Sequence, residues 1–143
     1  MRRADIIAEA RSWLGTPYHH QASVKGVGCD CLGLVRGVYA AVMGVDPETP
    51  PPYSKDWAEA RERETLLEAA GRHLKWISPD ERGGGDVVVY RFQHKSMAKH
   101  AGILTARNMM IHAVEGSPVC EVHVGPWWER RFAAVYEFPG VQD

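Results

Sequence analysis

The stretch Gly28-Cys29-Asp30-Cys31-Leu32-Gly33-Leu34 marks the point where an irregular segment is expected to turn into a helix. Asp30 suits the N-cap position, because its carboxylate accepts hydrogen bonds from unpaired backbone N–H groups, and Gly44 suits the helix end. The sequence therefore predicts a helix over residues 31–43 with the Cys31 thiol in its first turn. Apolar side chains recur along this helix at helical spacing: Leu34, Val35, Val38, Tyr39 and Val42.

A cysteine in the first turn of a helix faces the positive end of the helix dipole and several N–H groups without partners. This setting favours the thiolate over the thiol, and the same N–H groups are placed to bind an oxyanion. We therefore expect Cys31 to be an ionised nucleophile, which requires a base elsewhere in the chain. The plainer alternative is a small buried apolar residue. We interpret Cys29 as a structural or incidental thiol and expect Cys120, on a predicted strand, to lie in the core.

The composition is that of an ordinary globular domain, with 143 residues, 45% hydrophobic and 24% charged. The net charge of −1 gives no indication of a nucleic-acid or membrane surface. Neither a signal peptide nor a membrane span is predicted, since no long apolar run is present. Three cysteines without an export signal argue against a disulfide framework, so we expect reduced thiols in a single domain over 1–143.

The first half of the chain has helical periodicity and the second half has the pattern of strands. Helices are predicted over 3–14, 31–43 and 56–74, with a proline-rich extended stretch at 47–53. This order predicts an α+β fold, with N-terminal helices packed on one mostly antiparallel sheet of about five strands. The strands are expected over residues 86–92, 101–105, 109–113, 120–124 and 135–138.

The first and third predicted helices are amphipathic, so each is expected to bury one face. The first is expected to bury Ile6, Ile7, Ala10, Trp13 and Leu14. The third is expected to bury Trp57, Leu66, Leu67, Ala70 and Leu74.

Two of the seven histidines lie where a base and its orienting partner would be needed. His100 opens one predicted strand and His112 lies near the end of the next, with Arg107-Asn108 as the hairpin turn. In an antiparallel pair the start of one strand lies beside the end of its partner, so the two rings can face the same side. If the helix with Cys31 packs on that side, a thiol, a base and an orienting group come together, as nucleophilic catalysis requires.

The remaining histidines lack comparable support. His19 and His20 are expected to border the cleft and His73 to lie at the surface, while His94 and His123 receive no role. Cys29-x-Cys31 together with two histidines also offers four zinc-type ligands, but its one-residue spacing is shorter than that of structural zinc sites. We therefore expect no metal and no cofactor.

Five blocks of the sequence, in order and spanning nearly the whole chain, resemble the NlpC-type, papain-like cell-wall peptidases. The resemblance implies a papain-like domain that acts as a cysteine endopeptidase on peptide stems of peptidoglycan, typically near a D-γ-glutamyl linkage. The blocks are Leu14-Gly15-Thr16-Pro17-Tyr18, Asp30-Cys31-Leu32-Gly33-Leu34-Val35, Gly85-Asp86-Val87-Val88, His100-Ala101-Gly102-Ile103 and Met110-Ile111-His112-Ala113.

The resemblance also implies a role for each site residue. Cys31 is the nucleophile, His100 the base and His112 the group that orients the base. Tyr18 lies near the thiol and helps to hold the oxyanion, and Asp30 binds the substrate's amine or fixes the loop.

The sequence departs from the family pattern at two places. Leu32 stands where the family has a serine, and residues 19–23 replace a tryptophan and two glycines. Leucine cannot hydrogen-bond a substrate and glycines allow close approach, so the specificity and the shape of the cleft are left open.

Residues 21–29, the proline-rich stretch and Trp57-Ala58-Glu59-Ala60 resemble one branch of the family, found in the tail modules of phages and gene transfer agents. This implies a peptidase made in the cytoplasm and carried in the tail tip of a phage-like particle. Tail-tip and hub proteins would be its partners, and it would open the recipient wall for DNA. A structural tail-tip protein with a relic peptidase site is the alternative, motivated by Leu32 and by the missing glycines.

Two surface features have two interpretations each. Residues 127–132 combine tryptophans and arginines, which predicts either a short helix that closes the core or a docking patch. The proline-rich stretch is either a connector or a contact surface.

Overall fold

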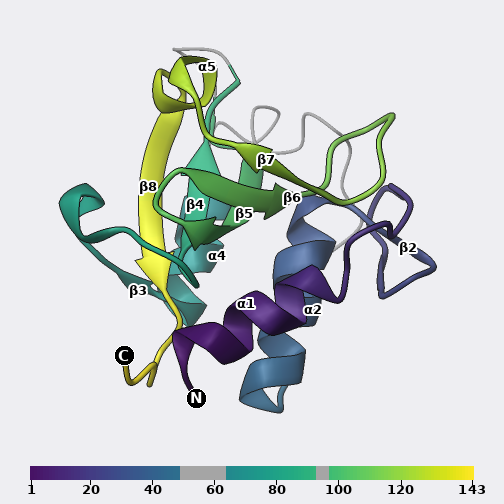
Figure 1. Ribbon diagram of the computed structural model, residues 1–143, viewed down its shortest axis with the longest axis horizontal. Coiled ribbons are helices and arrows are strands. Elements are labelled where there is room, and N and C mark those ends of the chain that lie inside the picture. Colours follow the sequence, from purple (N-terminus) through teal and green to yellow (C-terminus); the bar gives the residue numbers. More distant parts are fainter. Residues whose placement is uncertain (49–63, 93–96) are drawn as a thin grey trace.

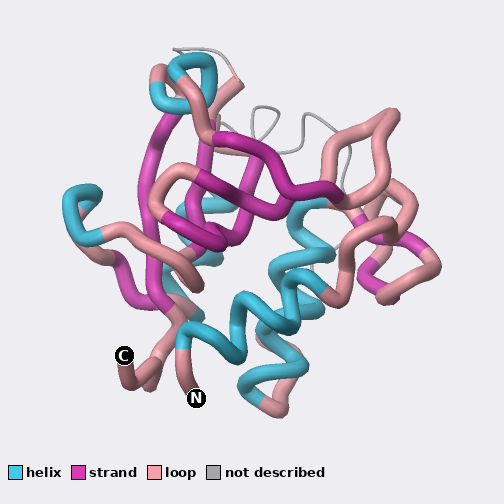
Figure 2. Tube along the Cα trace, in the orientation of Figure 1, coloured by secondary structure: helices cyan, strands magenta, loops and turns pink. Residues whose placement is uncertain are grey.

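The predicted helix that begins at Cys31, called here the nucleophile helix after the role expected of that residue, is present in the computed structural model, which describes residues 1–48, 64–92 and 97–143. Helix α2 runs from Cys31 to Met43, with Asp30 as its N-cap and Gly44 in the left-handed conformation at its end. The helices come first and most strands follow, as predicted (Figures 1 and 2). The other helices are α1 (Arg3–Arg11), α4 (Thr65–His73) and α5 (Pro126–Glu129), with a 3-10 turn at Pro79–Glu81.

A six-stranded sheet forms the second layer, in the order β3-β8-β4-β5-β6-β7 with every neighbouring pair antiparallel. The strands are β3 (Lys75–Trp76), β4 (Val87–Tyr90), β5 (His100–Ala106), β6 (Met109–His112), β7 (Cys120–His123) and β8 (Phe132–Glu137). The α+β fold is confirmed, and β3 is the strand that the sequence did not reveal. Two residues are too few to show an alternating pattern, so β3 exists only through its pairing with β8.

A small second sheet lies in the segment expected to be irregular. Strand β1 (Ser23–Val24) pairs with β2 (Gly28–Cys29), directly before α2. This hairpin fixes the chain that leads into the nucleophile helix.

The sheet separates two apolar clusters, because alternate residues of each strand point to opposite faces. Helices α1, α2 and α4 cover the face that carries Val87, Val89 and Ile103. The other face carries Val88, Tyr90, Leu104, Met110 and Val135, with Trp128 of α5 packed against them. The run Val87-Val88-Val89 is thus buried on both sides, as its unbroken apolar pattern predicted.

The helix boundaries differ from the prediction in two places. Helix α1 ends at Arg11 rather than residue 14, so Ile6, Ala10 and Trp13 are buried while Leu14 is 43% exposed. Helix α4 begins at Thr65, and the earlier part of the predicted third helix, including Trp57, lies outside the described residues. The proline run 50–52 and His94 lie outside them as well. None of the helices in the described ranges is long and apolar enough to cross a membrane.

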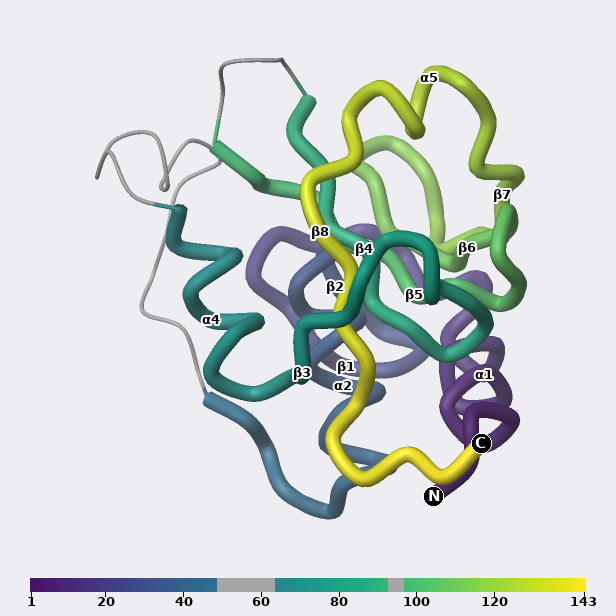
Figure 3. The backbone as a smooth tube through the Cα atoms, turned by 90° about the vertical axis from the view of Figure 1, so that its left-hand side faces the viewer, coloured from purple at the N-terminus to yellow at the C-terminus, as the bar shows by residue number. Residues whose placement is uncertain are grey.

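The two ends of the chain lie side by side (Figures 1 and 3). The Gln142 N–H donates to the Met1 carbonyl at 3.2 Å, and the backbone N–H of Arg3 donates to the Asp143 carboxylate at 2.7 Å. The Arg3 guanidinium contacts the carboxylates of Asp86, which is fully buried, and Glu137. Helix α1 is therefore tied by charge to the segment that leads into β4 and to the end of β8.

Candidate active site

The first turn of α2 is held by Asp30 and by a close approach of the preceding loop. The Asp30 carboxylate accepts the Gly33 N–H at 2.7 Å and the Gln21 N–H at 2.8 Å, and it is 3% exposed. A Cβ on Gly33 would lie 1.8 Å from the Ala22 carbonyl oxygen, so only glycine fits there. Asp30 thus caps the helix and fixes the loop, the second of its two expected roles.

The Cys31 thiol lies against the beginning of strand β5. Its Sγ donates to the Lys99 carbonyl oxygen at 3.6 Å, directly before His100 in the chain. The backbone N–H groups of Leu32 and Ala101 also face the sulfur. The thiol therefore lies beside backbone groups of Lys99 and Ala101, the two sequence neighbours of His100.

Burial acts against the predicted ionisation of Cys31. Burial raises the pKa of the thiol to about 12, and the Asp30 carboxylate acts in the same direction. Backbone N–H groups of Ala101, Leu32 and Cys31 lower the pKa without offsetting the burial. Desolvation therefore opposes the expected resting thiolate and favours the neutral thiol, against the effect of the helix terminus.

His100 and His112 form a direct pair, as the hairpin predicted. His112 lies opposite Gly102, so it is diagonal to His100, and His100 Nε2 is 2.9 Å from His112 Nδ1. Both side chains are buried, at 2% and 4% exposure. Burial and the neighbouring His112 lower the pKa of His100 to about 3, and burial lowers that of His112 to about 4. Both rings are therefore neutral at pH 7.

The neutral pair leaves one ring nitrogen of His100 for chemistry. With Nε2 engaged by His112, Nδ1 is the nitrogen that can accept a proton. For Nδ1 to be a base, His100 must carry its proton on Nε2 and donate it to His112 Nδ1. His112 then holds the tautomer of His100 that a base requires.

The side on which the nucleophile helix packs differs from the prediction. The histidines lie among Tyr90 and Trp128, on the face opposite the one that α2 covers. Cys31 and His100 instead line one cleft at the end of the sheet, where β5 begins beside the first turn of α2. This end-on arrangement follows from the packing of helix on sheet and leaves no periodic signal in the sequence.

Cys31 and His100 line the same cleft, which has a volume of about 320 Å³. Tyr18, His20 and Asp30 line it too. Four of the five predicted site residues, Tyr18, Asp30, Cys31 and His100, therefore line one cleft. The fifth, His112, does not line it but pairs with His100. Burial, together with the nearby Cys31 and Asp30, raises the pKa of Tyr18 to about 12, so its hydroxyl keeps its proton as a donor. His19 does not line the cleft, in contrast to the expectation for it.

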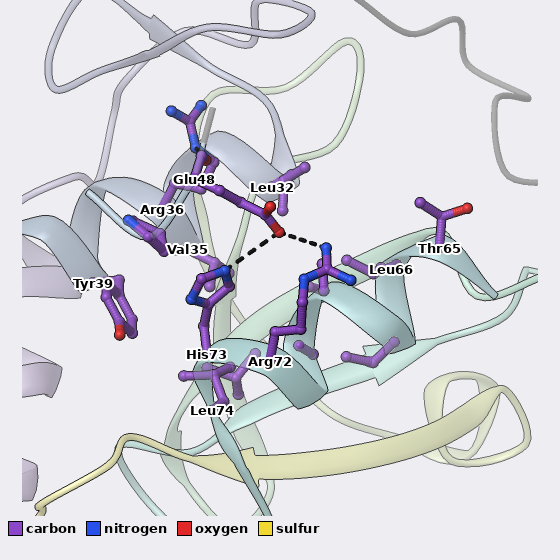
Figure 4. Close-up of a pocket in the computed structure, with 16 residues that line it drawn as sticks. Leu32, Val35, Arg36, Tyr39, Glu48, Thr65, Leu66, Arg72, His73 and Leu74 are labelled. Carbon is purple, nitrogen blue, oxygen red and sulfur yellow. Dashed lines mark hydrogen bonds and ion pairs between the residues drawn. The ribbon is translucent and has the colours of Figure 1, made fainter. Parts of the chain in front are cut away.

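A second, more apolar cavity of about 130 Å³ lies between α2 and α4 (Figure 4). It shares Leu32 and Leu66 with the cleft. Glu48 contacts Arg72 at 2.6 Å and His73 at 3.4 Å at its edge. His73 is thus partly buried against Glu48 and the Tyr39 ring, rather than at the surface as predicted. Neither Cys31 nor the paired histidines line this cavity, so the candidate chemistry belongs to the cleft.

The other two thiols are free, and neither lines the cleft. Cys29 is fully buried on β2, and Cys120 is only partly buried on β7, so its expected place in the core is wrong. Within the ranges that the structure describes, no three side chains of histidine, cysteine, aspartate or glutamate group as metal ligands.

Sequence reasoning missed the contact of Trp128 with the histidines. Residues 126–129 form a short helix, as one of the two interpretations had it, and Trp127 is 45% exposed. The Trp128 ring centroid, however, lies 5.2 Å from that of His100 and 5.3 Å from that of His112. No spacing rule connects residue 128 to residues 100 and 112, because α5 reaches them only through the fold.

Comparison with known proteins gives consistent results. The gamma-DL-glutamyl hydrolase of Bacillus subtilis (strain 168) is 24% identical over 134 residues, which are 93% of this chain and 29% of the relative. The NlpC/p60 domain of the peptidoglycan hydrolase SagA superposes with a TM-score of 0.71 at 23% identity, covering 96% of this chain and 100% of that one. An NlpC/P60 family protein from Bacillus cereus ATCC 10987 gives 0.69 at 19% identity, covering 96% and 40%.

The solved structures share the helices-on-sheet fold described above, and this chain spans less than a third of the curated relative. The model of the NlpC/P60 family matches residues 15–137. A match that runs from the loop before the nucleophile helix to the last strand means that the chain belongs to the NlpC/P60 family.

Proposed function

We propose that this protein is a cysteine endopeptidase that cleaves the peptide stems of peptidoglycan, with Cys31 as nucleophile and His100 as base. The observation that carries the proposal is the convergence of Cys31, His100 and Tyr18 on one cleft, with His112 bonded to the far side of the His100 ring. The names of two similar proteins, a peptidoglycan hydrolase and a gamma-DL-glutamyl hydrolase, support the substrate class.

The acylation step uses the neutral pair. As Sγ attacks the scissile carbonyl carbon, the thiol proton passes to His100 Nδ1, so the S–C bond forms without a resting thiolate. The sulfur first exchanges its Lys99 carbonyl partner for the imidazole. Protonated His100 then gives the proton to the leaving amine as the C–N bond breaks, and His112 stabilises the imidazolium through its Nδ1 lone pair.

The deacylation step reverses these roles. His100 Nδ1 takes a proton from water, the oxygen attacks the thioester carbonyl, and the sulfur leaves and regains the proton. The oxyanion of both steps is held by the Cys31 N–H, which has no partner within the helix, and by the Tyr18 hydroxyl. Asp30 contributes indirectly, by capping the turn that carries the sulfur.

Hydrolysis of defined muropeptides, analysed by mass spectrometry, tests the proposal. Wild type is expected to release products cut at the γ-D-glutamyl linkage, and Cys31→Ala none. The matched thiol control is Cys120→Ala, which removes a partly buried cysteine outside the cleft and retains activity. A wild-type protein that cleaves no peptidoglycan peptide overturns the proposal and favours the relic scaffold.

We also propose that the peptidase is made in the cytoplasm and works in the tail tip of a phage-like particle, with tail-tip or hub proteins as neighbours. Support comes from the resemblance of residues 21–29, 47–53 and 57–60 to the branch of the family found in the tail modules of phages and gene transfer agents. Mass spectrometry of purified particles is expected to find the chain with tail proteins. Its absence from particles whose other tail proteins are detected contradicts this role.

A further inference from the structure

The Trp128 ring contacts both histidines of the candidate site at once. Its plane is 25° from that of His100, a stacked arrangement, and 82° from that of His112, an edge contact. The two imidazoles are themselves 78° apart. A single indole therefore lies against the face of one ring and the edge of the other, in the mutual orientation that their hydrogen bond requires.

The helix that carries Trp128 is anchored on two sides. Arg82 contacts Glu129 at 3.0 Å, and the Arg131 guanidinium donates to the Phe92 carbonyl at 3.1 Å. The Trp128 ring also packs 4.9 Å from the Tyr90 ring and against the second apolar cluster. These contacts fix the position of the indole beside the histidine pair.

Trp128 does not line the cleft, so its effect on a reaction would pass through the histidines. The adjacent Trp127 offers a contrast on the same short helix. It is 45% exposed, has the Arg131 guanidinium 3.7 Å above its ring, and contacts Trp128 and Phe92 rather than the histidines.

We propose that Trp128 is a positioning residue for the peptidase reaction, which holds the His100 ring and its bond to His112 in the geometry that proton transfer needs. The inference rests on the proposed function. Stacking fixes the rotation of the His100 ring, and the indole keeps water away from the bond between the two rings. Without it the imidazole can rotate and exchange tautomers, so that Nδ1 is no longer kept unprotonated and ready to accept the thiol proton.

The test uses Trp128→Leu, Trp128→Phe and the control Trp127→Leu, each first checked for an unchanged melting temperature. In Trp128→Leu, kcat on a muropeptide is expected to fall about 10- to 100-fold with KM within about twofold, because only the proton-transfer geometry is lost. Trp128→Phe keeps an aromatic face and is expected to recover most of kcat. Trp127→Leu is expected to stay at the wild-type rate.

A second measurement is independent of hydrolysis. The ring ¹⁵N signals of His100 and His112 are expected to show one fixed tautomer each in wild type and Trp127→Leu, and averaged tautomers in Trp128→Leu. Fixed tautomers or an unchanged kcat in Trp128→Leu overturn the proposal. If wild type cleaves no muropeptide, the proposed function fails, and the ¹⁵N signals alone decide the positioning role. Trp128→Met replaces the leucine variant if that variant does not fold.

Discussion

At the scale of single residues, the site is built from groups that are neutral at rest. Burial raises the pKa of the Cys31 thiol and lowers those of both histidines. A neutral thiol and a neutral imidazole are the correct forms for a base that takes the proton during attack, rather than for a preformed ion pair. In the proposed mechanism, the charge that develops in the transition state is stabilised by His112, by backbone N–H groups and by Tyr18.

His112 is expected to act as an acceptor for the His100 Nε2 proton. His112→Asn keeps an oxygen acceptor and should lower kcat/KM about 10-fold, whereas His112→Ala should lower it by about 100-fold or more. Steady-state kinetics on one muropeptide with both variants tests the difference. Equal losses in the two variants would mean that His112 does not act by accepting this hydrogen bond.

The lowered histidine pKa values also predict how stability depends on pH. Both groups bind a proton more readily in the unfolded chain, whose histidines titrate near about 6.5, than in the folded one. Their contribution to stability is complete above that pH and is lost as the pH falls towards about 4, at up to about 1.4 kcal/mol per pH unit for each histidine. Urea unfolding between pH 7 and 5 should therefore show a shallower loss in His112→Asn than in wild type, and parallel losses would contradict the assignment.

At the scale of elements, the first turn of α2 owes its position to glycine and to Asp30 rather than to helix propensity. Gly33 lies where the Ala22 carbonyl oxygen reaches the helix backbone, and Gly37 lies where the Trp13 ring packs on it. Glycine usually weakens a helix interior, but here it permits the loop and α1 to approach closely. The loop–helix contact is what places the sulfur at the start of β5.

Two glycine substitutions should therefore have opposite effects. Gly33→Ala is expected to destabilise the protein by about 1–3 kcal/mol, since the new Cβ would overlap the Ala22 oxygen and force the loop away. Gly71→Ala in α4, where nothing lies within 4 Å of the new Cβ, should stabilise it by about 0.5–1 kcal/mol. Urea unfolding at neutral pH measures both, and a tolerated Gly33→Ala would show that the loop–helix contact is loose.

At the scale of the whole molecule, one charged cluster joins the beginning of the chain to the sheet. Arg3 contacts the fully buried Asp86 before β4 and Glu137 at the end of β8, beside the C-terminal residues. Burial raises the pKa of Asp86, and Arg3 counteracts this shift. The two chain ends lie at the opposite end of the molecule from α5 (Figures 1 and 3).

Removing Arg3 should cost far more than removing a surface arginine of the same helix. Arg3→Met leaves the Asp86 carboxylate buried without its partner, which is expected to destabilise the protein by about 3–5 kcal/mol. Arg11→Met removes a pair with Glu121 in which the arginine is 53% exposed, and should change stability by at most about 1 kcal/mol. Similar effects of both substitutions on urea unfolding would show that the Arg3 cluster is no stronger than a surface pair.

The sequence by itself determined most of the helices and strands and which residues to expect in the candidate site. Local rules act between near neighbours, so they located the helix behind Asp30, the turn at Arg107-Asn108 and the pairing of His100 with His112. The short strand β3 and the hairpin before α2 escaped them, because two-residue strands carry no period.

Only the tertiary structure decided the burial that opposes ionisation of Cys31, the face on which the histidines lie and the contact of Trp128 with them. Each of these depends on burial by segments far apart in the chain. Desolvation at Cys31 arises from its packing against β5, and it outweighs the helix terminus that the local sequence reveals. Which segments exclude water from a group is a property of the assembled fold, so it appears only once helix and sheet are packed together.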